Sequence, residues 1–82
     1  MKGVFLGSVH RQGVSKEGKE YSFYTSFFSN NDSKSDHIGQ DIFFGTHNDP
    51  FPELSEKNLG CEFYVYSFMS KGRTFINGVS KV

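Results

Sequence analysis

The sequence has no tryptophan, a single cysteine and only two prolines among its 82 residues. With Cys61 as the lone thiol, an internal disulfide is excluded, which agrees with a reducing compartment. No apolar run approaches the roughly 20 residues that a membrane-spanning helix needs. Residues 1–7 carry one positive charge and too short an apolar stretch for a secretory signal peptide. We therefore expect a cytoplasmic protein without a membrane partner.

Aromatic residues and glycines are abundant, with ten phenylalanines, four tyrosines and nine glycines. Aromatic side chains favour strands, whereas glycine favours turns and bulges. A chain of this length forms one small domain, residues 1–82, whose core is modest. Such a core cannot enclose every ring, so we expect some of the aromatic side chains on a surface.

Five β-prone segments predict five strands, at residues 2–15, 19–29, 41–47, 61–69 and 74–79. Tight turns at 16–19 and 70–73 join the first and last pairs, and Gly18 is placed to adopt a positive φ. Residues 29–36 predict a polar loop, and residues 53–59 predict either a short helix or a single turn. In the first strand, regular alternation places Val4, Leu6 and Ser8 on one face and Phe5, Gly7 and Val9 on the other.

This pattern indicates an all-β fold, a small five-stranded antiparallel Greek-key barrel of the oligonucleotide-binding type (OB-fold). An SH3-like barrel fits the number of strands nearly as well, and the pattern alone does not separate the two. The formal net charge is zero, but both ends of the chain are basic and the middle is acidic. If the two ends fold together, they form a positive face that attracts a polyanion.

The first hairpin combines cations with aromatic rings. Lys19, Tyr21 and Phe23 alternate along one strand and so point to one face. Lys16 lies in the adjoining turn and Arg11 on the partner strand. A single-stranded nucleic acid offers a charged backbone to the cations and unstacked bases to the rings. The pattern leaves open that Tyr21 and Phe23 pack in the core, with Tyr24 and Phe28 taking the exposed side.

The segment from residue 12 to residue 23, QGVSKEGKEYSF, resembles the DNA-binding wing of the filamentous-phage single-stranded-DNA-binding proteins, the gene V or helix-destabilising family. In that wing, Gly-Val-Ser is followed by a basic residue, a variable residue, Gly-Lys, a variable residue, Tyr-Ser and an apolar residue. The matching positions are Gly13, Val14, Ser15, Lys16, Gly18, Lys19, Tyr21, Ser22 and Phe23. An arginine two residues before the glycine is matched by Arg11.

The resemblance implies an OB-fold homodimer that binds single-stranded DNA cooperatively and with little sequence preference. It implies that the protein coats viral strands during rolling-circle phage replication in the host bacterial cytoplasm and holds them for packaging. By resemblance, Arg11, Lys16 and Lys19 contact phosphates, while Tyr21 and Phe23 contact bases. In the family, the closing hairpin contributes to dimerisation and carries an aromatic tip near the DNA. By resemblance, Arg73 or Phe75 stands here near the position of that aromatic, which this chain lacks. The turn is about two residues shorter here, and Phe68 and Phe75 are expected near the dimer contact.

No catalytic, metal or cofactor site is expected, so the protein is not interpreted as an enzyme. The three histidines, His10, His37 and His47, do not form a metal-binding spacing with Cys61. Three aspartates, Asp36, Asp41 and Asp49, are interpreted as solvated loop charges. No nucleophile motif or glycine-rich phosphate loop is present. Two alternatives remain, an RNA-binding barrel of cold-shock type and a small β-barrel protein-interaction module.

Overall fold

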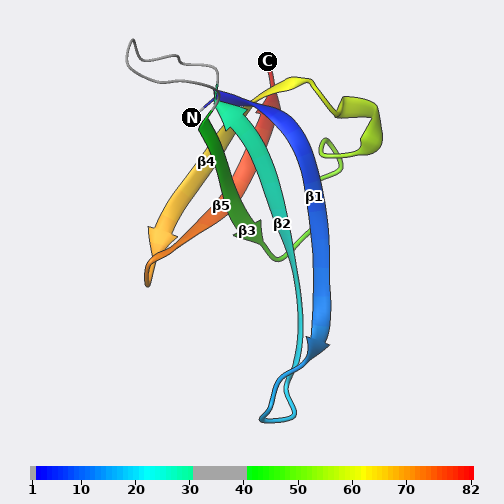
Figure 1. Ribbon diagram of the computed structural model, residues 1–82, viewed down its shortest axis with the longest axis vertical. Coiled ribbons are helices and arrows are strands. Elements are labelled where there is room, and N and C mark those ends of the chain that lie inside the picture. The colour runs from blue at the N-terminus through cyan, green and yellow to red at the C-terminus, as the bar shows by residue number, and fades with distance from the viewer. Residues whose placement is uncertain (1, 31–40) are drawn as a thin grey trace.

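The computed structural model describes residues 2–30 and 41–82. Its elements, in chain order, are the strands and one short 3-10 helix shown in Figure 1: β1 (Lys2–Val14), β2 (Glu20–Asn30), β3 (Asp41–His47), η1 (Glu56–Asn58), β4 (Glu62–Ser70) and β5 (Arg73–Lys81). The all-β prediction is confirmed, and each strand begins and ends within a residue or two of its expected bounds.

The strands form a closed barrel in the order β1-β2-β3-β5-β4, with β4 returning to β1. This arrangement confirms the small five-stranded barrel that the sequence predicts. One strand pair differs from the expected antiparallel arrangement, because β3 and β5 pair in parallel through Thr46 and Phe75. The barrel is therefore mixed, and its closure between β3 and β5 is much shorter than the β1–β2 pairing.

The core is built from a few large apolar side chains contributed by four of the strands. Its buried members are Phe5, Phe28, Phe63, Val65 and Ile76. The ring of Phe5 packs 5.8 Å from that of Phe28 and 6.2 Å from that of Phe63, measured between centroids. Phe28 is fully buried. The alternative that placed Phe28 on the exposed side is therefore wrong.

A β-bulge in β1 breaks the regular alternation expected there. The register with β2 shifts between Phe5 and Gly7, so that Phe5 faces Phe28 and Gly7 faces Phe27. Leu6 is the extra residue, and beyond it the two faces of β1 exchange. Ser8, which pairs with Ser26, therefore lies on the face of Phe5, not opposite to it as expected.

Beyond the barrel, β1 and β2 continue alone as a two-stranded ribbon, here called the wing (residues 11–23). It extends downward in Figure 1, because β1 pairs with β4 only over 2–4 and β2 pairs with β3 only from Tyr24 onward. At its tip the amide of Ser15 donates to the Lys19 carbonyl at 2.8 Å, and Gly18 has a φ of 80°. The positive φ expected at Gly18 is confirmed.

Between β3 and β4 the chain forms turns and the single 3-10 turn η1, so residues 53–59 do not form a longer helix. Residues 31–36 of the expected polar loop lie outside the described residues. Across residues 2–30 and 41–82, the structure contains no helix with the length and apolar character to cross a membrane.

Candidate nucleic-acid interface

One face of the β1–β2–β3 sheet, here called the front face, carries a row of four aromatic rings. Tyr21, Phe23 and Phe27 alternate along β2, and Phe44 of β3 stands opposite Phe27 in the register. Ring centroids are 5.9 Å apart for Tyr21 and Phe23, and 5.7 Å apart for Phe27 and Phe44. The strand geometry thus aligns two ring pairs along one surface.

The rings of the front face are accessible to a ligand. Tyr21 keeps 46% of its surface exposed and Phe44 keeps 60%, whereas Phe23 and Phe27 are half-buried. An exposed phenylalanine or tyrosine costs free energy unless a partner covers it. The row is therefore a surface suited to stacking rather than a part of the core.

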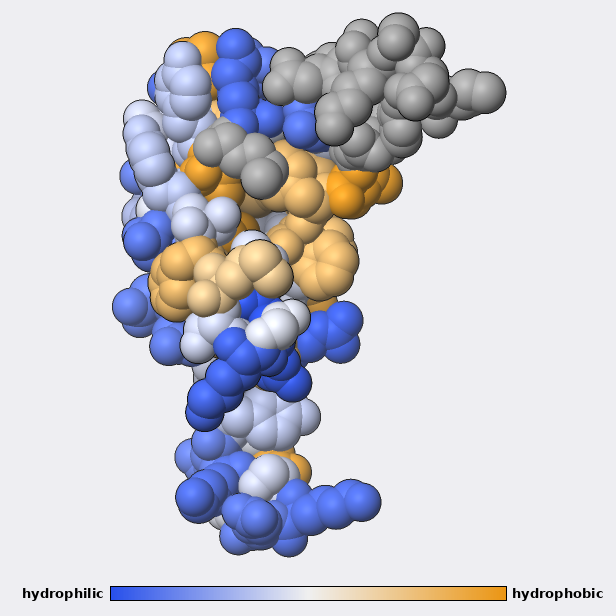
Figure 2. All heavy atoms as spheres, turned by 90° about the vertical axis from the view of Figure 1, so that its left-hand side faces the viewer, coloured by the Kyte–Doolittle hydropathy of each residue, from blue (hydrophilic) through white to orange (hydrophobic). Residues whose placement is uncertain are grey.

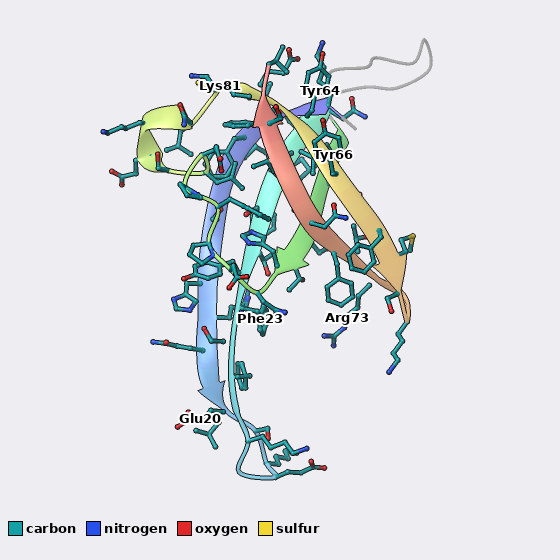
Figure 3. The ribbon with its side chains drawn as sticks, turned by 180° about the vertical axis from the view of Figure 1, so that it is seen from behind. Glu20, Phe23, Tyr64, Tyr66, Arg73 and Lys81 are labelled. Carbon is teal, nitrogen blue, oxygen red and sulfur yellow. The ribbon has the colours of Figure 1, made fainter. Side chains whose placement is uncertain are left out.

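Two arginines flank this row from different parts of the chain. Arg11 of β1 stands opposite Phe23, and Arg73 begins β5 at the end of the closing hairpin. Both arginines and Phe23 line an open cavity of about 540 Å³ that Phe44 also borders, and they line an adjoining one of about 660 Å³ that Tyr21 borders. Figure 3 shows Phe23 and Arg73 facing each other across the space between the wing and the closing hairpin.

The structure brings together four of the six residues that the sequence proposes for binding. Arg11, Tyr21, Phe23 and Arg73 border one cavity. The other two, Lys16 and Lys19, are exposed at the wing tip, where the side chains are hydrophilic (Figure 2). They border none of the cavities of the front face.

Among the described residues, Arg11 and Arg73 form no ion pair with a carboxylate. Within residues 2–30 and 41–82, the one ion pair joins Lys2 to Glu62 at 3.5 Å. Glu20, the acidic residue at the start of β2, stands opposite Val14 and so points away from the face of Tyr21. Arg11 and Arg73 are thus available to an external anion such as a phosphate.

Tyr24 points to the opposite side of the sheet, here called the back face. Its ring stacks on His10 at 4.3 Å and lies 5.6 Å from the buried ring of His47. It is half-buried. The alternative in which Tyr24 takes the exposed side in place of Tyr21 is therefore wrong.

Two rings of the front face, Phe27 and Phe44, are absent from the sequence-based site. Both lie in runs of adjacent aromatic residues, where alternation alone does not say which ring points outward. The pairing of β2 with β3 decides it, because Phe28 and Phe43 stack together at 5.3 Å on the core side. The sequence places Phe44 in the predicted third strand but does not indicate which face of the sheet its ring occupies.

Among the residues that the structure describes, no group of three histidine, cysteine, aspartate or glutamate side chains is arranged to hold a metal ion. His37 and Asp36 lie outside the described residues.

No family model, curated protein or solved structure matches this chain.

Proposed function

We propose that the protein binds single-stranded DNA without sequence preference, as a member of the filamentous-phage type that coats viral strands during rolling-circle replication and holds them for packaging. The observation that carries the proposal is the row of four rings on the front face, flanked by Arg11 and Arg73. The wing sequence that resembles the phage proteins supplies two of these rings.

The chemistry of a single strand matches this surface. Bases that are not paired expose their flat faces, and each base stacked on an aromatic side chain contributes about 1–3 kcal/mol. Stacking is tolerant of sequence because every base has such a face. The arginines add charge-assisted hydrogen bonds to phosphate oxygens, which also carry no sequence information.

The position of the surface on the barrel supports the same function. OB-folds bind oligonucleotides on the face of strands 2 and 3 and at the loops between strands 1 and 2 and between strands 4 and 5. Here the rings lie on β2 and β3, Lys16 and Lys19 lie in the first of these loops, and Arg73 adjoins the second. The three regions form a continuous candidate path for a strand.

We also propose that the protein acts as a homodimer through the closing hairpin β4–β5. The rings of Phe68 and Phe75 stack there at 5.5 Å, and Phe68 remains 50% exposed. The neighbouring Met69 is 73% exposed, and Figure 2 shows apolar side chains gathered in a band above the hydrophilic wing. Covering this surface with a second copy would remove apolar area from water.

A titration of the full chain with fluorescent oligo-dT, at two salt concentrations, tests the binding proposal. We expect oligo-dT to bind far more tightly than a duplex of equal length, because paired bases cannot stack on the rings. Competition with oligo-U distinguishes DNA from the RNA alternative. Equal affinity for single and double strands, or binding that ignores salt, would contradict the proposal.

A further inference from the structure

The back face of the β1–β2–β3 sheet carries a column of four adjoining rings, of which the first three are stacked. His10 lies on Tyr24, Tyr24 on His47, and His47 packs against Phe51 at 4.4 Å between centroids. A cavity of about 170 Å³ borders the column. Its remaining lining comes from Ser8 of β1 and from Pro50 and Leu54 in the segment after β3. It shares only His10 with the cavities of the front face.

A chain of hydrogen bonds leads from the interior to the edge of this cavity. His47 Nδ1 lies 2.7 Å from the carbonyl oxygen of Asp49, and His47 Nε2 lies 2.7 Å from Ser26 Oγ. Ser26 Oγ in turn lies 2.8 Å from Ser8 Oγ. Ser26 is fully buried and His47 nearly so, whereas Ser8 is exposed.

The direction of these hydrogen bonds follows from the first of them. A carbonyl oxygen only accepts, so Nδ1 of His47 must carry the hydrogen, and in the neutral ring Nε2 is then an acceptor. The Ser26 hydroxyl therefore donates to His47, and the Ser8 hydroxyl donates to Ser26. Because its one hydrogen points inward, Ser8 Oγ offers only lone pairs to the cavity.

The size and lining of the cavity restrict the ligand further. A cavity of about 150 Å³ holds a benzene ring, so this one fits a single six-membered aromatic ring. Aromatic walls favour a flat ligand with a few directed polar contacts. The acceptor at Ser8 requires an N–H or O–H donor on the ligand's edge.

We propose that this cavity is a binding site for one pyrimidine base. The base packs against the ring column and donates an N–H to Ser8 Oγ, from the amino group of cytosine or the ring N3–H of thymine. A purine, with two fused rings, is larger than the single ring that a cavity of about 170 Å³ accommodates. Since the site lies on the back face, it does not depend on the function proposed for the front face. Its base comes either from a free nucleoside or from a nucleic-acid strand.

Nuclear magnetic resonance titration of the full chain tests the site with thymidine, deoxycytidine and deoxyadenosine. These nucleosides carry no phosphate, so attraction to the arginines does not contribute. Both pyrimidine nucleosides should shift the resonances of Ser8, His10 and Phe51, and deoxyadenosine should bind at least fivefold more weakly. Ser8→Ala should weaken pyrimidine binding about three- to tenfold, the value of one hydrogen bond. Ser80→Ala, an exposed strand serine outside the cavity, should leave it unchanged.

Leu54→Phe provides a second variant, because the larger side chain fills the cavity without touching the hydrogen-bond chain. It should abolish the nucleoside shifts. If only oligo-dT, and not thymidine, shifts the same resonances and Leu54→Phe removes those shifts, the base comes from a strand. The proposal is overturned if neither probe shifts these resonances, if deoxyadenosine binds as well as thymidine, or if Ser8→Ala binds like the natural chain. A Tyr21→Ala titration with oligo-dT reports on the front face separately.

Discussion

The ring of Tyr21 lies directly against the backbone of Gly13, its partner across the wing. A Cβ atom placed on Gly13 would stand 2.7 Å from the Tyr21 hydroxyl oxygen and 2.9 Å from the adjoining ring carbon. Real Cβ atoms essentially never show such contacts. The absence of a side chain at Gly13 therefore sets the position of the exposed ring.

This contact predicts that Gly13→Ala weakens binding of oligo-dT while the barrel stays folded, because Tyr21 must leave its position. We expect a loss of roughly 1 kcal/mol, within the range for one stacked base. Gly78→Ala is the matched control, since its Cβ would meet Tyr66 at an ordinary 3.6 Å. Fluorescence titrations and thermal melts of both variants give the result. An unchanged affinity of Gly13→Ala for oligo-dT would show that binding does not depend on the position of the Tyr21 ring.

Replacing Tyr21 or Tyr24 by alanine should have opposite effects. Tyr21→Ala should cost about 1–3 kcal/mol in oligo-dT binding and little in stability, since an exposed ring leaves no cavity. Tyr24→Ala removes one of the two inner rings of the back-face column and should destabilise folding, by less than the roughly 3–5 kcal/mol of a fully buried aromatic. Denaturant unfolding and oligo-dT titration of both variants measure these effects. The reverse result would mean that the front and back faces of the β1–β2–β3 sheet are wrongly assigned.

Phe44 should contribute to binding although the sequence alone does not identify it. Phe44→Ala is expected to weaken oligo-dT binding by about 1–3 kcal/mol, because it removes one end of the ring row. Leu59→Ala provides the control, as Leu59 is similarly exposed but lies beside η1. In titrations with oligo-dT of increasing length, Phe44→Ala should lose affinity only for oligomers long enough to reach β3. Equal effects of the two substitutions would remove Phe44 from the interface.

The salt dependence of DNA binding should report how many phosphates the cations of the protein neutralise. Each neutralised phosphate of a single strand contributes about −0.7 to the slope of log affinity against log salt concentration. The three cations of the wing, Arg11, Lys16 and Lys19, therefore give a slope near −2, and Arg73 brings it near −3. Arg11→Ala and Arg73→Ala should each flatten the slope by about 0.7. Lys57→Ala, on η1, should not change it. Slopes that remain unchanged in Lys16→Ala and Lys19→Ala would show that the strand does not reach the wing tip.

The dimer proposal predicts sedimentation of two copies of the 9.3 kDa chain at micromolar concentration. Phe68→Asp should give a folded monomer, because a charge buried at the contact is costly. Leu59→Asp, an equivalent exposed substitution away from the hairpin, should remain a dimer. Sedimentation of the natural chain as a monomer would contradict the proposal.

Much of the architecture follows from local patterns in the sequence. Alternation and turn residues predict the five strands and the wing. The shared face of Tyr21 and Phe23 follows from strand geometry and is confirmed. What the local pattern does not contain is pairing across long connections. The strands β2 and β3 are connected through residues 31–40, and their register directs Phe44 outward. The packing of Phe28 against Phe5 in the core turns the adjacent Phe27 outward as well.

Two further features depend on contacts between distant segments. Arg73 reaches the cavity of Arg11 only because β5 closes against β3, a packing that no local motif encodes. The bulge at Leu6 has a weak signal, since glycines within strands often mark bulges and Gly7 follows it. Regular alternation was the simpler interpretation, and it misplaced Ser8.

The bulge gives the wing a property that can be described as parity. From Ser8 to Val14, each residue emerges on the side opposite to the one that regular alternation from Phe5 would give it, because Leu6 is left out of the pairing with β2. If Leu6 were instead paired in a regular strand, the whole segment would invert without any change of sequence. Arg11 would move to the side of Tyr24, and His10 would take its place beside Phe23. The one unpaired residue of β1 thus decides which side of the wing carries the charge of Arg11.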